Sequence, residues 1–237
     1  MKDSLGDRIK SNYENRYRFY LPRRTNVIIR LDGCHFHTNT KKCEKPFDMR
    51  LNKVFEHTLI DLVQNIQNCK IGYHQSDEIS LLLTDYNDIS TEAWYDNNLQ
   101  KIASVSASMC TMYFNQYTKI HYPGFMESYF DSRVFVIPEE AEVSNYFLWR
   151  SQDCFRNAIS SQAQALYSQK QLQNKNSNEM QEMCFEKGVN CSEIDKYIKN
   201  GRWINKNIGN FAFENKPSFI DINNLIWSKV DKQNEVK

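Results

Sequence analysis

Residues 70–84 form the stretch KIGYHQSDEISLLLT, which decides the fold that we expect for this chain. Two runs of strand-forming residues flank Ser76 and Asp77, a pattern typical of a β-hairpin with its carboxylates at the tip. Residues 26–32, NVIIRLD, predict a buried strand that ends in Asp32. Placed beside the hairpin, this strand would bring Asp32 close to Asp77 and Glu78.

The elements around this hairpin predict an α+β fold. Apolar residues recur at helical spacing over 48–67 and 91–117, and residues 132–137 predict a strand that Pro138 ends. The expected order is therefore the ferredoxin-like βαββαβ arrangement, which also forms the palm of many polymerases and nucleotidyl cyclases.

The chain divides into two expected parts that form one structural unit. Residues 1–139 would form the palm-like catalytic core, beginning with a helical segment over residues 1–20. Residues 140–237 would form a mostly helical extension packed on the palm. Within the extension we expect a helix over 143–173, a turn leading into a short strand over 198–204, and a further strand at 225–227.

The acidic residues at the predicted sheet edge suggest a metal site. Carboxylates on a rigid edge are the hard oxygen ligands that Mg²⁺ requires. The alternative is two ordinary turns, since Asp is common in turns. Cys34, His35 and His37 could suggest zinc instead, but no second closely spaced ligand pair follows them.

The distribution of charge is more informative than its sum. The formal net charge is only +1, yet residues 1–53 hold thirteen Lys and Arg against six Asp and Glu. Residues 71–100 hold six acidic residues and no Lys or Arg. A basic surface beside an acidic one suits a metal-dependent enzyme that acts on a polyanion, whereas a solvated N-terminal arm is the alternative.

Cysteine usage predicts a reducing compartment. The seven cysteines are odd in number and contain no Cys-x-x-Cys pair, and no apolar signal segment precedes them. No stretch is long enough to span a membrane. We expect a cytoplasmic protein, with a mitochondrial location left open because Asp3, Asp7 and Glu14 argue only weakly against a presequence.

Four motifs occur in order along the chain: RLDGCHFH at 30–37, KPFD at 45–48, QSDE at 75–78 and WRSQDC at 149–154. Together they resemble the tRNA-His guanylyltransferase superfamily, whose members extend RNA in the 3′-to-5′ direction. The similarity covers residues 1–165 well and the remainder loosely.

The resemblance implies roles for individual residues. Asp32, Asp77 and Glu78 would be catalytic, with Asp32, Asp77 and the Gly33 carbonyl binding two Mg²⁺ ions. Glu78 would be either a further metal ligand or an orienting group. The positions implied to contact a nucleoside triphosphate, GTP or ATP, are Gly33, Cys34, His35, Phe36, His37, Ser76 and Lys101.

One stretch departs from the family pattern. Members that add guanylate to tRNA-His carry His-Ile-Asn-Asn-Leu-Tyr-Asn after the Asp-Cys pair, whereas residues 155–161 here are FRNAISS. This resembles the guanylyltransferase-like branch that repairs tRNA 5′ ends. We therefore expect Mg²⁺-dependent, templated 3′-to-5′ addition to truncated tRNA. The alternatives are a tRNA-His guanylyltransferase, a catalytically idle palm that only binds nucleotide or RNA, and a nucleotidyl cyclase.

The expected macromolecular partner is tRNA, and no membrane is involved. Basic residues near the motifs are the predicted RNA contacts: Arg23, Arg24, Lys41, Lys42, Arg150 and Arg156. The resemblance also implies a homo-oligomer such as a tetramer.

Overall fold

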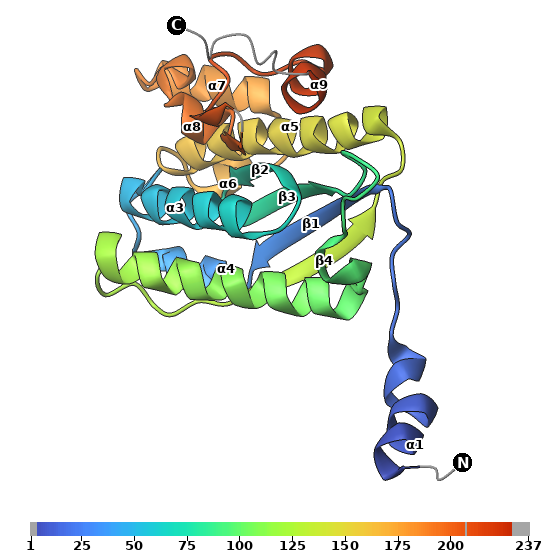
Figure 1. Cartoon of the computed structure of the whole chain (residues 1–237). Helices are drawn as coiled ribbons and strands as arrows, with labels where there is room; N and C mark the ends of the chain where they lie inside the picture. Colours follow the sequence, from blue (N-terminus) through green and yellow to red (C-terminus); the bar gives the residue numbers. More distant parts are fainter. Residues whose placement is uncertain (1–3, 207, 229–237) are drawn as a thin grey trace, which may run out of the picture.

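The computed structural model describes residues 4–206 and 208–228, and its centre is a six-stranded antiparallel sheet (Figure 1). The strands lie in the order β4-β1-β3-β2-β5-β6. Their bounds are Asn26–Gly33 for β1, Cys69–Gln75 for β2, Glu78–Thr84 for β3, Phe130–Val136 for β4, Arg202–Asn205 for β5 and Gly209–Phe211 for β6. The first four strands follow the split βαβ arrangement, so the predicted ferredoxin-like fold is confirmed.

Alternate residues of each strand face two different cores. Val27 and Ile29 of β1 pack with helices α3 (Met49–Asn65) and α4 (Leu99–His121) on one face of the sheet. Ile28, between them, packs with α5 (Glu140–Gln164) on the other face (Figure 1). Because side chains alternate along a strand and both faces are covered, β1 is apolar at almost every position until it reaches the site.

The chain after β4 is mostly helical, as expected. It contains α5, α6 (Gln169–Leu172), α7 (Ser177–Glu186), the 3₁₀ turn η4 (Cys191–Glu193), α8 (Lys196–Lys199) and α9 (Phe219–Trp227). It also returns to the sheet, where Trp203 of β5 lies opposite Tyr73 of β2. We retain the division into a palm over 1–139 and an extension over 140–237 as a proposal, in which the extension supplies β5 and β6 to the sheet of the palm.

The C-terminal part of the sequence prediction needs two corrections. Residues 225–227, expected as a strand, are the end of α9, because Ser218 and Asp221 form a capping box that starts a helix there. Its buried Ile222 and Ile226 lie one helical turn apart. The helix expected over 143–173 ends as α5 at Gln164, and the short α6 follows it.

The long helix of the palm begins later than predicted. We expected it from residue 91, but α4 starts at Leu99, where the Asn98 side chain accepts a hydrogen bond from the amide of Lys101 at 3.0 Å. Before it, the 3₁₀ turn η3 (Trp94–Asn97) contains Tyr95 and Asp96, each with φ of 50°. A right-handed helix cannot run through residues in that conformation.

Short helical segments complete the chain. Residues before the sheet form α1 (Leu5–Asn12) and the 3₁₀ turn η1 (Glu14–Tyr17), which extend away from the body (Figure 1). The loop after β1 contains α2 (Phe36–Asn39) and the 3₁₀ turn η2 (Thr40–Lys42). All seven cysteines are free thiols, and five are buried. Across residues 4–206 and 208–228, none of the helices has the length and apolar character needed to cross a bilayer.

Candidate active site

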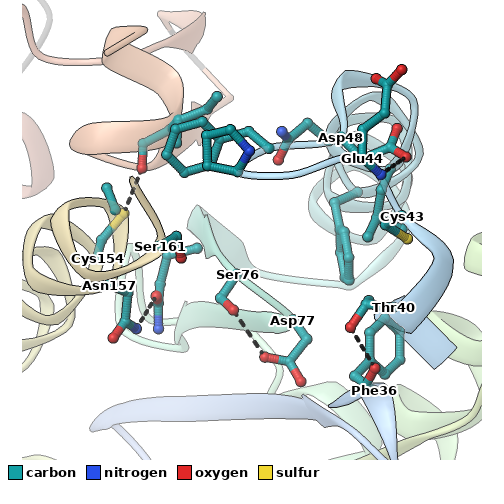
Figure 2. Close-up of a pocket in the computed structure, with 18 of the residues that line it drawn as sticks. Phe36, Thr40, Cys43, Glu44, Asp48, Ser76, Asp77, Cys154, Asn157 and Ser161 are labelled. Atoms are coloured by element: carbon teal, nitrogen blue, oxygen red, sulfur yellow. Dashed lines mark hydrogen bonds between the residues drawn. The ribbon is translucent and has the colours of Figure 1, made fainter. Parts of the chain in front are cut away.

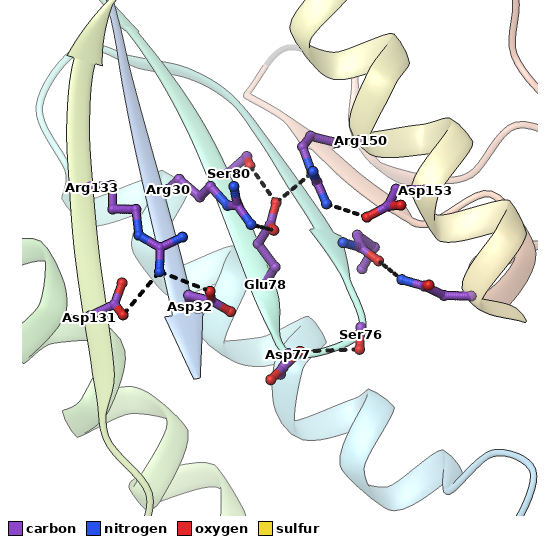
Figure 3. A network of polar contacts seen from close by, with 12 residues as sticks. Arg30, Asp32, Ser76, Asp77, Glu78, Ser80, Asp131, Arg133, Arg150 and Asp153 are labelled. Atoms are coloured by element: carbon purple, nitrogen blue, oxygen red, sulfur yellow. Dashed lines mark hydrogen bonds and ion pairs between the residues drawn. The ribbon is translucent and has the colours of Figure 1, made fainter. Parts of the chain in front are cut away.

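The tip of the β2–β3 hairpin lies beside the end of β1. Ser76 and Asp77 form its two-residue loop, and Ser76 has a φ of 53°, which residues other than glycine rarely adopt. The amide of Gly33 donates a hydrogen bond to the Asp77 carbonyl at 3.1 Å, and Asp32 lies opposite Glu78 in the sheet. Asp32 and Asp77 therefore come together at one end of the sheet, as the sequence predicted (Figure 3).

The two aspartates meet in a partly buried setting. Burial raises the pKa of Asp77, and the negative charge of Asp32 raises it further. The Asp32 carboxylate pairs with Arg133 Nη2 of β4 at 3.3 Å, and Arg133 also contacts Asp131 (Figure 3). Arg133 was not predicted as a site residue, because only the pairing of β4 with β1 brings it there. A buried Asp77 carboxylate whose ionisation is disfavoured by the neighbouring charge of Asp32 favours a cation between the two side chains.

The donor atoms at this edge fit Mg²⁺. Among the residues that the structure describes, no three or more His, Cys, Asp and Glu side chains are grouped to hold a metal ion. Mg²⁺ does not need such a group, because it usually takes one or two carboxylates and completes its shell with water and substrate phosphates. Asp32, Asp77 and the Gly33 carbonyl are hard oxygen donors of that kind.

Two arginines hold Glu78, the residue after Asp77. Its carboxylate pairs with Arg30 Nη2 at 2.6 Å and with Arg150 Nε at 2.9 Å (Figure 3). Burial raises the pKa of Glu78, while the two guanidinium charges oppose that effect. Each carboxylate oxygen is engaged by an arginine, which favours the orienting role for Glu78 over the metal-ligand role.

The loop after β1 is shaped by a buried ring. A side chain on Gly33 would lie 2.2 Å from the ring of Phe36, so this position requires glycine. The Phe36 ring itself packs in the core against Phe55 and Phe114. Phe36 therefore presents its backbone to the site. His35, with a φ of 60°, precedes α2, whose first amides have no partner within the helix.

A cavity of about 380 Å³ opens beside Asp77 (Figure 2). Its walls come from the loop after β1, α3, the hairpin tip and α5. Ser76 and Asp77 of the hairpin tip line it, and Asn157 and Ser161 of α5 lie on one side. The amide of Asn157 donates to Gln75 Oε1 at 3.4 Å. This volume is in the range of pockets that hold small ligands.

Asp48 fixes the opposite wall of the cavity. Its buried side chain caps α3 by accepting from the amide of Arg50 at 3.1 Å, and it also accepts from the amide of Glu44 at 3.1 Å. Although burial opposes ionisation, hydrogen bonds from Arg50 and Glu44 lower the pKa of Asp48 to about 2. The KPFD motif thus holds the cavity wall through a carboxylate that stays charged at physiological pH.

Buried His74 should make stability depend on pH. Its ring stacks on Phe55 at a centroid distance of 4.5 Å, and Nε2–H donates to the Ser76 carbonyl at 2.9 Å. Burial lowers the pKa of His74 from 6.5 to about 4. In the unfolded chain His74 binds a proton near pH 6.5, whereas in the folded chain it stays neutral until about pH 4. The free energy of unfolding therefore falls as the pH drops from 6.5 towards 4.

We expect the free energy of unfolding to fall by about 2 kcal/mol between pH 7 and pH 5 because of His74. Urea unfolding at several pH values, compared with His74→Gln, measures this contribution. The variant should show a shallower decline over that range. Parallel curves for the two proteins would exclude His74 as the cause.

Lys101 does not lie at this end of the sheet. It stands in the first turn of α4, with Nζ 5.6 Å from the centre of the Tyr95 ring. The helix reaches the end of the sheet that holds Asp32 and Asp77 only near Thr111, about 15 Å further along its axis than Lys101. There the Thr111 hydroxyl accepts a hydrogen bond from the amide of Phe130. The predicted contact between Lys101 and a triphosphate at Asp77 is therefore not formed within one copy of this chain.

Four of the predicted RNA contacts are held within the protein. Arg23 pairs with Asp85 at 2.9 Å, and Arg24 Nη2 donates to the Ile89 carbonyl at 2.8 Å, both at the far end of the sheet from Asp32. Arg150 is buried, and Arg156, although exposed, pairs with Asp153. In contrast, Lys41 and Lys42 are exposed in η2, next to the cavity.

The residue that replaces the family's histidine lies away from the cavity. Phe155 packs on a separate cluster formed by α5, α7 and η4, and Lys216 Nζ lies 5.1 Å from its ring centre. Cys154, Asn157 and Ser161 on the other side of α5 line the cavity. The departure at residue 155 therefore alters the packing of the extension, while Asn157, which the family motif retains, faces the site.

Comparison with known proteins agrees with this geometry. The family model described as tRNAHis guanylyltransferase matches residues 6–138. A solved bacterial tRNA(His) guanylyltransferase-like protein in complex with ATP is 48% identical, with a TM-score of 0.84 over 90% of this chain and 93% of that one. A solved bacterial protein of the same description in complex with GTP is 43% identical, with a TM-score of 0.75 over the same shares.

The curated relatives are more distant. A probable tRNA(His) guanylyltransferase of Homo sapiens is 29% identical over 143 residues, which are 56% of this chain and 45% of that protein. This chain therefore spans about half the length of the curated guanylyltransferase that it matches there.

Proposed function

Because this chain belongs to the tRNAHis guanylyltransferase family, we propose that it adds nucleotides to the 5′ end of truncated tRNA. The proposed reaction is templated, runs in the 3′-to-5′ direction and depends on Mg²⁺. The observation that carries the proposal is the meeting of Asp32 and Asp77 at one end of the sheet, beside a nucleotide-sized cavity that Asp77 lines.

The geometry suits transfer to an activated phosphate. The reaction joins a nucleotide 3′-hydroxyl to the 5′-phosphate of an RNA, so charge develops on the attacking oxygen and on the leaving group. Mg²⁺ held by Asp32, Asp77 and the Gly33 carbonyl would stabilise that charge. The Ser76 hydroxyl donates to Asp77 Oδ1 at 3.2 Å and helps to set the direction of this carboxylate.

The incoming nucleotide has a ready place beside these oxygens. Amides at the start of α2 are donors for a triphosphate, and the cavity beside them takes the base and sugar. The solved relatives that hold ATP and GTP support both nucleotides as substrates.

A direct assay separates the candidate activities. The substrates are a 5′-truncated tRNA with a 5′-triphosphate, which needs no separate activation, and a full-length tRNA-His that lacks its extra guanylate. With labelled nucleotides and Mg²⁺, extension of the truncated tRNA supports repair. Extension of tRNA-His alone supports the dedicated guanylyltransferase, a cyclic nucleotide formed without RNA supports a cyclase, and no product with either RNA supports an idle palm. EDTA should abolish extension.

RNA binding should depend on the lysines beside the cavity. We expect the double variant Lys41→Ala, Lys42→Ala to lower the slope of log affinity against log salt by about 1.5, because each phosphate contact contributes roughly 0.7 to 0.9. Filter binding of tRNA at several salt concentrations gives the slope. The pair Arg23→Ala, Arg24→Ala is the comparison, since both guanidiniums already have partners. An equal loss in both variants would place the RNA along the whole length of the palm.

A further inference from the structure

A row of alternating charges runs from the catalytic hairpin to α5 (Figure 3). Arg30 of β1 pairs with Glu78 of β3, and Glu78 pairs with Arg150 of α5. Arg150 then reaches Asp153 with Nη2 at 2.6 Å. The side chains of Glu78 and Arg150 are only 5% and 4% exposed, so the centre of this row is almost closed to water.

Packing fixes the position of Arg150 from the outside as well. Its guanidinium carbon lies 4.1 Å above the centre of the Trp149 ring. On the same side of α5, the Tyr146 hydroxyl lies 2.7 Å from Ser80 Oγ of β3. Asn157, two turns further on, bonds Gln75 at the end of β2. Helix α5 thus contacts the β2–β3 hairpin at several points along its length, and Arg150 makes the charged contact, with Glu78.

We propose that Arg150 is a positioning residue, which acts through Glu78 to hold Asp77 at a fixed distance from Asp32. This inference rests on the proposed nucleotide transfer. Glu78 directly follows Asp77 and lies opposite Asp32 in the sheet, so any movement of Glu78 moves the hairpin tip against β1. Because its two carboxylate oxygens are engaged by arginines on β1 and α5, Glu78 is fixed from both sides.

The cost of a buried charge makes this arrangement sensitive to Arg150. A buried carboxylate that loses one of its two charged partners must turn towards the other or towards water. Glu78 would then turn towards Arg30, and the loop of Ser76 and Asp77 would follow it. Displacement of a catalytic group by about 1 Å is enough to cost on the order of 100-fold in rate.

A double-mutant cycle tests the inference. At saturating nucleotide, we expect Arg150→Met to lower kcat for nucleotide addition about 10- to 100-fold with the KM for tRNA changed little. Arg150→Lys, which keeps the charge, should recover part of that loss. Glu78→Gln should be slow alone, and adding Arg150→Met should not slow it further, because both changes break one contact.

Arg202→Met is the matched control. Arg202 also pairs with a glutamate, Glu56, at 2.6 Å and also stacks on an aromatic ring, Tyr197 at 4.0 Å, but it joins β5 to α3. A kcat loss in Arg150→Met no larger than in Arg202→Met, or additive effects in the cycle, would overturn the proposal. If Arg150→Met does not fold, Arg150→Lys takes its place in the cycle.

The two proposals fail in different ways. Wild-type protein that extends no tRNA contradicts the proposed function. The same variants are then compared by calorimetry of ATP binding at several Mg²⁺ concentrations. Binding about tenfold weaker in Arg150→Met than in Arg202→Met supports the positioning role, and equal binding overturns it.

Discussion

Replacing Asp77 with Asn is expected to lower the rate of nucleotide addition by about 100-fold or more, and Asp32→Asn should act alike. Both carboxylates lie at one sheet edge, and the amide of Gly33, the residue after Asp32, bonds the Asp77 carbonyl. An amide supplies a weaker oxygen ligand and no negative charge, so Mg²⁺ would be held less firmly. Single-turnover assays on 5′-truncated tRNA over a range of Mg²⁺ concentrations measure the loss.

The fold should survive these changes. Burial already disfavours the charged form of Asp77, so a neutral side chain of the same size should leave the melting temperature unchanged or higher. Asp131→Asn is the matched control. Asp131 of β4 lies opposite Asp32 in the sheet, but among the described residues it pairs only with Arg133. Near-normal turnover of Asp77→Asn at low millimolar Mg²⁺ would remove the metal assignment.

The palm was predictable because its signals are local. The apolar run of β1, the hairpin residues around Ser76 and the helical spacing over residues 48–67 each depend on neighbours in the sequence. Strand adjacency then follows from the βαββαβ order, and it brings Asp32 to Asp77.

The rest of the site depends on contacts that the sequence does not display. Arg150 was expected to bind RNA, yet it is buried against Glu78, 72 residues away in the chain, and no local pattern distinguishes a buried arginine from an exposed one. Lys101 was expected at the triphosphate. Its actual place is set by where α4 begins, which depends on the Asn98 cap and the left-handed residues before it.

The choice of nucleotide is expected to follow the RNA template. The family stretch that distinguishes addition of guanylate to tRNA-His is absent at residues 155–161, and Phe155 packs away from the cavity. The described lining of the cavity includes the polar side chains of Gln75, Asn157 and Ser161, which can hydrogen-bond to more than one base. Base pairing with the opposite strand can therefore make the selection.

Changing the base opposite the vacant 5′ position should change which nucleotide is added, with the matched nucleotide preferred by about tenfold or more, the ratio given by about 1.4 kcal/mol. The measurement uses four truncated tRNAs that differ only in that base, each offered the four labelled nucleotides in turn. A tRNA with no opposing base is the control, and it should be extended slowly with every nucleotide. Addition of guanylate whatever the opposing base would contradict templating. That result would mean that the cavity itself selects guanine, and it would favour the dedicated tRNA-His activity.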